Sequence, residues 1–310
     1  MYNVLSITIP FFAIIFLGTA FSFRKIFNND NSKVLTKYAL YVTLPPFMFV
    51  NILKSSENIN IFNWDFILRF ELITIILLSM SFIISLFFLQ NHKKESSIFA
   101  LNSTYPNYGY MGIPLCILAF GQEASIPISL ILLIDTLILL TFTSFFATNS
   151  KKNNFFVEIF TIIKNLLQNP ILSAVFIGFI FLIFEIHIYG FIFKFLELLS
   201  LAATPTALFA IGINLYNKVD KNSLKKILFI VFIKLFLHPF LIFIIFYIFP
   251  TNSPVLWINV AILCASLPVA GNVFAMSIFY NSYIKITSGA ILVTTILSTF
   301  TVPLILYLLL

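Results

Sequence analysis

Long apolar stretches follow one another along the chain, and short polar segments separate them. A helix needs about 20 mostly apolar residues to span the hydrocarbon core of a bilayer. The pattern therefore predicts an all-α membrane protein with ten transmembrane helices, and the segments between them are too short for a soluble domain. The ten predicted spans are residues 3–22, 34–53, 66–89, 97–120, 125–148, 167–187, 191–215, 227–249, 255–280 and 284–309.

The composition agrees with a lipid environment for most of the chain. Hydrophobic residues make up 60% of the sequence and charged residues only 9%, whereas a typical soluble domain has about 25% charged residues. The first apolar stretch begins at the third residue and has no basic region before it. A signal peptide is shorter and follows positive charge, so we interpret this stretch as a membrane span.

The basic residues predict the orientation of the chain. Fourteen of the 18 lysines and arginines lie in or beside the odd-numbered loops, counted from the loop after the first span. Cytoplasmic loops carry the excess of positive charge, so we expect a multi-pass protein of the plasma (inner) membrane with both termini extracytoplasmic. The net charge of +7 is scattered through these short loops and does not indicate a nucleic-acid partner.

Proline positions suggest an internal repeat. Pro45 in the second span and Pro205 in the seventh are 160 residues apart, and Pro106 in the fourth and Pro268 in the ninth are 162 apart. Prolines are common in membrane helices, so coincidence is the alternative explanation. We interpret the near-constant offset as a repeat of five spans.

An odd number of spans in each half makes the second half enter the membrane from the opposite side, so the repeat is inverted. The predicted halves are residues 1–150 and 167–310, and a short cytoplasmic loop at 151–166 joins them. Inverted repeats with discontinuous helices are typical of secondary transporters, which bind substrate near the membrane midplane at the breaks.

The fourth and ninth spans contain polar and helix-breaking residues. Pro106 and Pro268 each remove a backbone donor, and freed backbone groups at membrane depth must face protein or a water-filled cavity. Half-helix N-termini that meet there would attract an anion such as a carboxylate; structural kinks repaired by Ser and Thr are the alternative. The candidate substrate-binding residues are Thr104, Pro106, Asn107, Tyr108, Gly109, Asn169, Pro268, Gly271 and Asn272.

Two asparagines are the candidate side-chain donors. Asn107 follows the break in the fourth span, and Asn169 with Pro170 opens the sixth. An amide donates to a carboxylate without the desolvation cost of a buried cation. Asn169 could instead serve only as a helix cap, since proline is common at the first helical position.

Three charged residues lie within the predicted spans. Lys234 follows five apolar residues in the eighth span, Glu71 lies near the outer end of the third, and Asp135 lies in the middle of the fifth. Intramembrane charges are costly and usually functional. Glu71 and Lys234 could form an ion pair, or Glu71 could be interfacial beside Arg69; Asp135 could bind a coupling ion, a proton or sodium, or only hydroxyl groups.

The sequence contains no nucleophile–base set, phosphate-binding loop or zinc motif, so we expect no enzyme. Cys116 and Cys264 are isolated, and the three histidines belong to different segments. This spacing does not predict a metal site, and no cofactor is expected.

The residues around these breaks resemble the auxin efflux carrier family, which includes plant auxin exporters and bacterial carriers for organic acids such as malate and malonate. The resemblance covers nearly the whole chain. It rests on Pro106-Asn107 followed by Met111-Gly112-Ile113-Pro114-Leu115, on Leu267-Pro268 with Phe274 and Tyr280-Asn281, on Asn169-Pro170, and on Lys234 with Pro239.

The resemblance implies a scaffold domain of spans 1, 2, 6 and 7 and a transport domain of spans 3–5 and 8–10, which moves like an elevator. It also implies a homodimer through the scaffold, substrate contacts from Asn107 and Asn169, and a supporting charged site with Glu71 and Lys234. The chain lacks the long central loop of the plant proteins, and Glu71 aligns with the family aspartate only through a gap.

Three functions follow as hypotheses. The first is a carrier for a small organic anion, a carboxylate, that works by alternating access. The second is a sodium-coupled symporter of the bile-acid carrier type, for which Asp135 is the deep acidic candidate. The third is a membrane receptor or channel.

Overall fold

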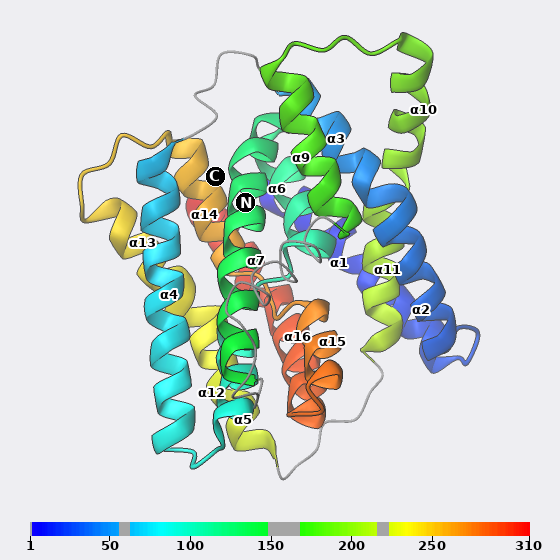
Figure 1. The fold of residues 1–310 in the computed structure, drawn as a ribbon. Helices are drawn as coiled ribbons and strands as arrows, with labels where there is room; N and C mark the ends of the chain where they lie inside the picture. Colours follow the sequence, from blue (N-terminus) through cyan, green and yellow to red (C-terminus); the bar gives the residue numbers. More distant parts are fainter. Residues whose placement is uncertain (1, 56–62, 148–167, 216–222) are drawn as a thin grey trace.

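The computed structural model describes residues 2–55, 63–147, 168–215 and 223–310, and these parts form helices joined by short connections (Figure 1). Helical structure occupies each of the ten predicted spans. Over the described residues, six helices are long and apolar enough to cross a membrane, and three shorter ones are also apolar. The helices are α1 (Tyr2–Phe23), α2 (Asn29–Tyr38), α3 (Leu44–Lys54), α4 (Trp64–Phe87), α5 (Lys93–Thr104), α6 (Ile113–Phe120), α7 (Ser125–Ala147), α9 (Pro170–Ile183), α10 (Gly190–Leu201), α11 (Ala203–Asn214), α12 (Leu224–Phe232), α13 (His238–Tyr247), α14 (Val255–Ala265), α15 (Gly271–Phe279) and α16 (Ile284–Leu309).

Over the residues that the structure describes, three of the helical spans contain a five-residue π-helical segment. The segments are η1 (Ala39–Thr43), η2 (Tyr108–Gly112) and η5 (Ile233–Leu237). In each case a proline is the second residue after the segment, at Pro45, Pro114 and Pro239. A proline ring clashes with the carbonyl one turn earlier and cannot donate to it, so a widened turn relieves the clash. Such π segments are frequent at functional sites.

The helices pack in two sets (Figure 1). In the first set α1 packs against α11, α3 against α9 and α10, and α2 against α11. In the second set α4 packs against α5, α7 and α13, and α12 against α16. α6 and α7 also contact both sets, so the two sets form one continuous body.

Two glycines bring α1 and α11 into backbone contact. Gly18 on α1 faces Gly212 on α11, and the hydroxyl of Thr19 donates to the Gly212 carbonyl at 2.9 Å. A Cβ on Gly212 would overlap the carbonyl oxygen of Ile15 and lie 3.1 Å from the Gly18 Cα. Small residues commonly permit such close crossings between membrane helices.

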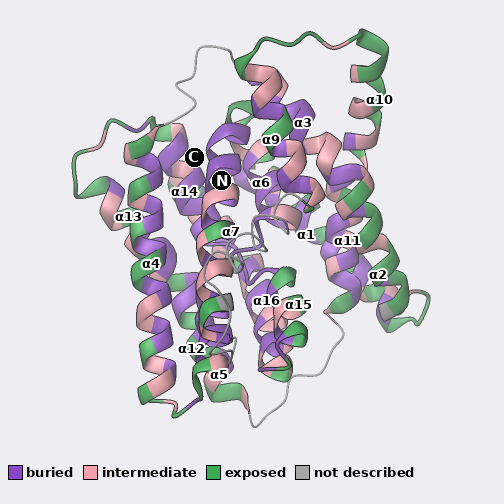
Figure 2. Cartoon of the chain, in the orientation of Figure 1, coloured by how far each residue is buried: buried purple, intermediate pink, exposed green. Residues whose placement is uncertain are grey.

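Apolar side chains cover the outer faces of the helices, as expected for contact with lipid. On α4 the exposed leucines and isoleucines recur after one or two helical turns and so form one stripe along the helix, on which Figure 2 colours exposed residues green. This stripe consists of Leu68, Leu72, Ile75, Ile76 and Ile83. A soluble protein rarely exposes so continuous an apolar surface.

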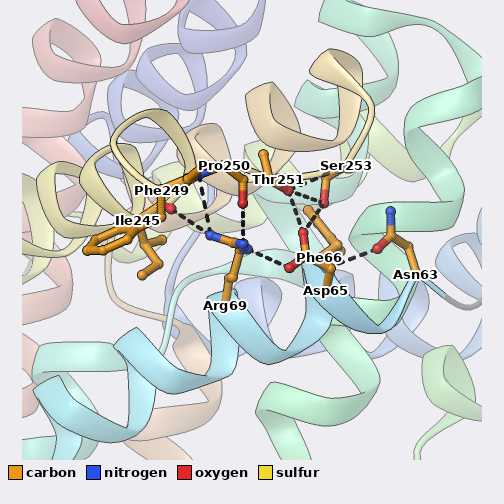
Figure 3. Close-up of polar contacts among 9 residues, drawn as sticks. All are labelled: Asn63, Asp65, Phe66, Arg69, Ile245, Phe249, Pro250, Thr251 and Ser253. Atoms are coloured by element: carbon orange, nitrogen blue, oxygen red, sulfur yellow. Dashed lines mark hydrogen bonds and ion pairs between the residues drawn. The ribbon is translucent and has the colours of Figure 1, made fainter.

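Arg69 joins the start of α4 to the end of α13 (Figure 3). Its guanidinium donates to the carboxylate of Asp65 at 2.7 Å and to the carbonyl oxygens of Ile245 and Pro250 at 3.1 and 2.5 Å. A cation near the last carbonyls of a helix stabilises that end. Arg69 is therefore paired with Asp65 and with backbone carbonyls, whereas the sequence suggested only that it lies at the membrane interface.

Candidate functional site

The two broken helices cross at their breaks. α5 ends at Thr104 and is followed by extended Tyr105, and α14 ends at Ala265 and is followed by a turn at Ser266. The two segments pair as an antiparallel bridge at Pro106 and Val269. Within this crossing Asn107 N donates to Pro268 O at 2.9 Å and Ala270 N donates to Tyr105 O at 3.1 Å. Each break thereby satisfies backbone groups that the other break exposes, as the hydrocarbon region requires.

A small pocket lies beside this crossing. Its volume is about 20 Å³ for the centres of water-sized molecules, which is room for little more than one water molecule. The pocket is lined by Leu40, Tyr105, Pro106, Asn107, Tyr108, Gly109, Tyr110, Leu132, Thr136, Asn169, Ile171, Leu172, Ala270 and Asn272. Segments from both helix sets contribute, since Asn169 caps α9 of the first set and Thr136 lies on α7, which packs in the second.

Three helices begin at this pocket. One runs from Tyr108 to Phe120 through η2 and α6, the second is α9 from Pro170, and the third is α15 from Gly271. The first-turn N–H groups of a helix have no partner within it and carry a partial positive charge. Three such ends at one pocket make it suitable for an anion.

The two candidate asparagines are the capping residues of two of these helices. Asn107 is 5% exposed, and its Oδ1 accepts from Tyr110 N at 3.4 Å. Asn169 Oδ1 accepts from Ile171 N and Leu172 N at 3.0 and 3.4 Å. Capping thus accounts for Oδ1 of both residues, and both amide NH₂ groups stay available because a cap accepts only through oxygen.

The predicted binding residues divide into those that line the pocket and those that hold the crossing. Pro106, Asn107, Tyr108, Gly109, Asn169 and Asn272 line the pocket. Thr104, Pro268 and Gly271 are not among its lining residues. The Thr104 hydroxyl instead donates to Ala100 O at 2.9 Å, the Pro268 carbonyl accepts from Asn107, and Gly271 begins α15 beside the pocket.

Eight lining residues were not predicted from the sequence. Tyr105 and Tyr110 lie inside the polar stretch of the fourth span, and Thr136 follows Asp135, so their neighbours gave a usable signal. Leu40, Leu132, Ile171, Leu172 and Ala270 are apolar or small and had no signal that distinguishes them from other span residues.

A buried charged cluster lies directly behind the pocket. The Tyr108 hydroxyl donates to Asp135 Oδ2 at 2.7 Å, so one lining residue connects the pocket to Asp135. Asp135 and Lys234 are both fully buried, and Glu71 is 5% exposed. Asp135 lies close enough to both Glu71 and Lys234 for their charges to interact.

The direct ion pair that the sequence suggested between Glu71 and Lys234 does not occur among the described salt bridges. Lys234 Nζ instead donates to Ala265 O at 2.7 Å, at the end of α14, and lies 3.2 Å from His238 Nδ1. The physical reason is that Ala265 O ends a broken helix and needs a donor.

Several buried polar atoms of this cluster have no hydrogen-bond partner among the described residues. They are Glu71 Oε2, Thr74 Oγ1, Asp135 Oδ1 and His238 Nε2. Buried polar atoms are usually satisfied, so these atoms mark a place where a proton, an ion or water would be stabilised. Over the same described residues, no group of three or more His, Cys, Asp or Glu side chains gathers as a metal site would require.

Comparison with known proteins agrees with this architecture. A family model described as "Membrane transport protein" matches residues 4–306. A protein of Rhizobium meliloti (strain 1021) named "Putative malonate transporter" is 30% identical over 312 residues, which cover 99% of this chain and 96% of that protein. Both matches indicate a transporter and not an enzyme. The chain therefore belongs to the membrane transport protein family of the auxin efflux carriers.

Proposed function

We propose that the chain carries a small organic anion, a carboxylate, across the plasma membrane by alternating access. The observation that carries this proposal is the convergence of three helix N-termini and two asparagines on one pocket at the helix crossing. Partial positive charge and amide donors suit a carboxylate. The name of the Rhizobium meliloti relative points to malonate or a compound of similar size as the first substrate to test.

We further propose ten membrane spans in two inverted halves, with both termini extracytoplasmic. Contacts between helices support this arrangement. The first span packs on the seventh (α1 with α11) and the second on the sixth (α3 with α9), which are equivalent pairs if the halves repeat. The same contacts support a scaffold of spans 1, 2, 6 and 7, which would also form the homodimer.

Elevator movement requires that spans 3–5 and 8–10 move together. Two polar clusters support this by joining the third span to the eighth at both ends. At one end Arg69 binds the carbonyls after α13. At the other, Lys226 on α12 donates to Asn91 Oδ1 at 2.8 Å, and Asn91 donates to Tyr283 and Ser85. Spans tied at both ends move as one body.

Uptake of radiolabelled malonate into liposomes that contain the purified protein tests this function. The expected result is saturable uptake above that of empty liposomes. Asn107→Ala should reduce uptake at least tenfold, since it removes the buried amide donor, worth roughly 1.5–3 kcal/mol to a charged ligand. Asn259→Ala is the matched control, because Asn259 is partly buried and its amide donates to Leu309 O outside the pocket.

Unchanged uptake by the Asn107→Ala variant would remove the assignment of the binding site. Flux that does not saturate, or binding without flux, would indicate the channel or receptor hypothesis instead.

A coupled symporter is the second candidate, because buried oxygen atoms of Glu71, Thr74 and Asp135 beside the pocket have no hydrogen-bond partner in the described part of the chain. Oxygen atoms are the ligands that hard cations prefer, so sodium is one ion that could bind there. Replacement of sodium by choline in the uptake buffer separates the two candidates. Equal uptake in both buffers would exclude sodium coupling.

A further inference from the structure

We propose that Cys116 and Cys264 form a redox modification site, at which a peroxide oxidises the two thiols to a disulfide that ties the broken helices together and slows transport. The disulfide itself does not depend on the proposed function, whereas its effect on transport rests on it. The chain contains only these two cysteines, so a disulfide within one molecule can form only between them.

The two thiols are neighbours although they are 148 residues apart in the sequence. Cys116 lies on α6 and Cys264 is the last residue but one of α14, so each broken helix contributes one cysteine. Both cysteines are free and fully buried, and their Sγ atoms are 3.9 Å apart. α6 and α14 pack against each other, which brings the two backbones together.

A disulfide can form here with a small movement of the side chains. The S–S bond is about 2.05 Å long, so the sulfur atoms must approach each other by about 1.9 Å from their separation of 3.9 Å. A change between staggered rotamers about the Cα–Cβ bond moves a cysteine sulfur farther than this and leaves the backbone in place. The two cysteines therefore have the proximity that a disulfide requires.

A small oxidant can reach the cysteines from the pocket. Tyr108 lines the pocket and lies close enough to Cys264 for their charges to interact. The pocket has room for little more than one water molecule. Hydrogen peroxide is uncharged and not much larger than water, so it can enter without the cost of burying a charge.

The reaction balances with one peroxide molecule. The Cys264 sulfur attacks a peroxide oxygen, the O–O bond breaks, and a sulfenic acid and one water molecule form. The Cys116 sulfur then attacks the sulfenic sulfur, so that the S–S bond forms, the S–O bond breaks, and a second water molecule leaves with the Cys116 proton. Both sulfur atoms are oxidised, and both peroxide oxygens are reduced to water.

The disulfide opposes a widening that the pocket needs. A space for about one water molecule is too small for a carboxylate with its carbon chain, so the lining segments must separate when a substrate binds. Tyr108 and Gly109 of the lining lead into α6, and Ala270 and Asn272 follow α14. A covalent bond between α6 and α14 holds these segments at their closed spacing, so the oxidised protein should bind substrate more weakly.

A count of free thiols on the purified full-length protein tests the modification. The protein in detergent is treated with hydrogen peroxide, denatured and labelled with N-ethylmaleimide, and the labels are counted by mass spectrometry. Because the chain has two cysteines, we expect both to be labelled before peroxide, neither after it, and both again after dithiothreitol, all on the monomer of a non-reducing gel. Full labelling after peroxide, or a loss that dithiothreitol does not reverse, would overturn the proposal.

Uptake of radiolabelled malonate into liposomes tests the effect on transport. Peroxide should reduce initial uptake at least about fivefold, the lower end of typical coupling between two sites, and dithiothreitol should restore it. Cys116→Ala and Cys264→Ala are the control variants, either of which serves if the other does not fold. Each keeps a single thiol, so peroxide should leave its uptake unchanged.

Two results of the uptake experiment would refute the regulation of transport. An equal loss of uptake in the control variants would assign the effect to other oxidisable side chains, such as methionine. Unchanged uptake by protein that has formed the disulfide would show that the bond does not slow transport. If the untreated protein carries no malonate, the proposed function fails, whereas the thiol count still decides whether the modification site exists.

Discussion

The contact between Gly18 and Gly212 gives the sharpest prediction about stability. Gly212→Ala adds one methyl group at the point where α1 and α11 touch backbone to backbone. The new Cβ would overlap the Ile15 carbonyl oxygen and lie 2.9 Å from the Ile15 carbonyl carbon. Non-bonded carbon atoms normally lie about 3.5–4.0 Å apart, so the helices must separate by at least roughly 0.6 Å.

The cost of this separation can be estimated from its parts. Overpacking costs about 1–3 kcal/mol, and the lengthened Thr19–Gly212 hydrogen bond, now 2.9 Å, contributes about 0.5–1.5 kcal/mol. Alanine favours a helix over glycine by about 1 kcal/mol, which offsets part of the loss. The free energy of unfolding should therefore fall by roughly 1–3 kcal/mol.

Thermal unfolding of the purified protein in detergent measures this effect. We expect Gly212→Ala to lower the midpoint by several degrees. Gly190→Ala is the matched control, because a Cβ on Gly190 would meet nothing within 4 Å and that residue begins α10. A Gly212→Ala midpoint equal to that of Gly190→Ala would refute the close contact between α1 and α11.

Three further predictions concern polar groups. Asn169→Asp keeps the oxygen that caps α9 but adds a negative charge and removes an amide donor. Anion uptake should therefore fall at least tenfold, with little change in the thermal midpoint. A fall in both uptake and midpoint would mean that Asn169 is only a cap. Arg69→Met removes the hydrogen bonds to the carbonyls at the end of α13 and after it, so the free energy of unfolding should fall by about 1–3 kcal/mol. The thermal midpoint should then be lower than that of the control Arg24→Met, in which the replaced side chain is exposed. Equal midpoints would contradict this. Lys234→Met leaves Ala265 O without its donor, so the free energy of unfolding should fall by about 3–5 kcal/mol. The double variant with Asp135→Asn should recover part of this loss. Additive losses in the two single variants would show that the two charges do not interact.

The sequence could predict the position of each break because proline acts locally. Pro106 and Pro268 lack a backbone donor wherever they stand, and both fall where helical structure stops. Asn169 before Pro170 likewise predicts a helix start from local chemistry alone. The start of the second span differs from the prediction. Helix α2 begins at Asn29 and not at residue 34, because Asn28 forms a capping box with Asn31.

Contacts between distant segments could not be predicted in the same way. Glu71 and Lys234 are 163 residues apart, close to the offsets of 160 and 162 between the repeated prolines, but such an offset does not fix where a long side chain points. Lys234 satisfies the carbonyl of Ala265, and Asp135 bonds to Tyr108. Both partners depend on how the broken helices cross, which is a tertiary property.

The crossing explains why the pocket and the breaks occupy the same place. A broken helix in lipid exposes backbone groups that must be satisfied by protein, and two breaks can satisfy part of each other's needs, as Asn107 and Ala270 do with their bonds to Pro268 and Tyr105. The N–H groups that remain at the new helix ends then point to one shared space. Asn169 reaches this space from a helix that packs on α3 in the other set. If the crossing moves relative to the set that contains α3 and α9 during transport, Asn107 and the helix ends at the crossing stay with the substrate. The contact between the substrate and Asn169 then breaks. Asn169 would therefore govern binding from one side of the membrane and release to the other.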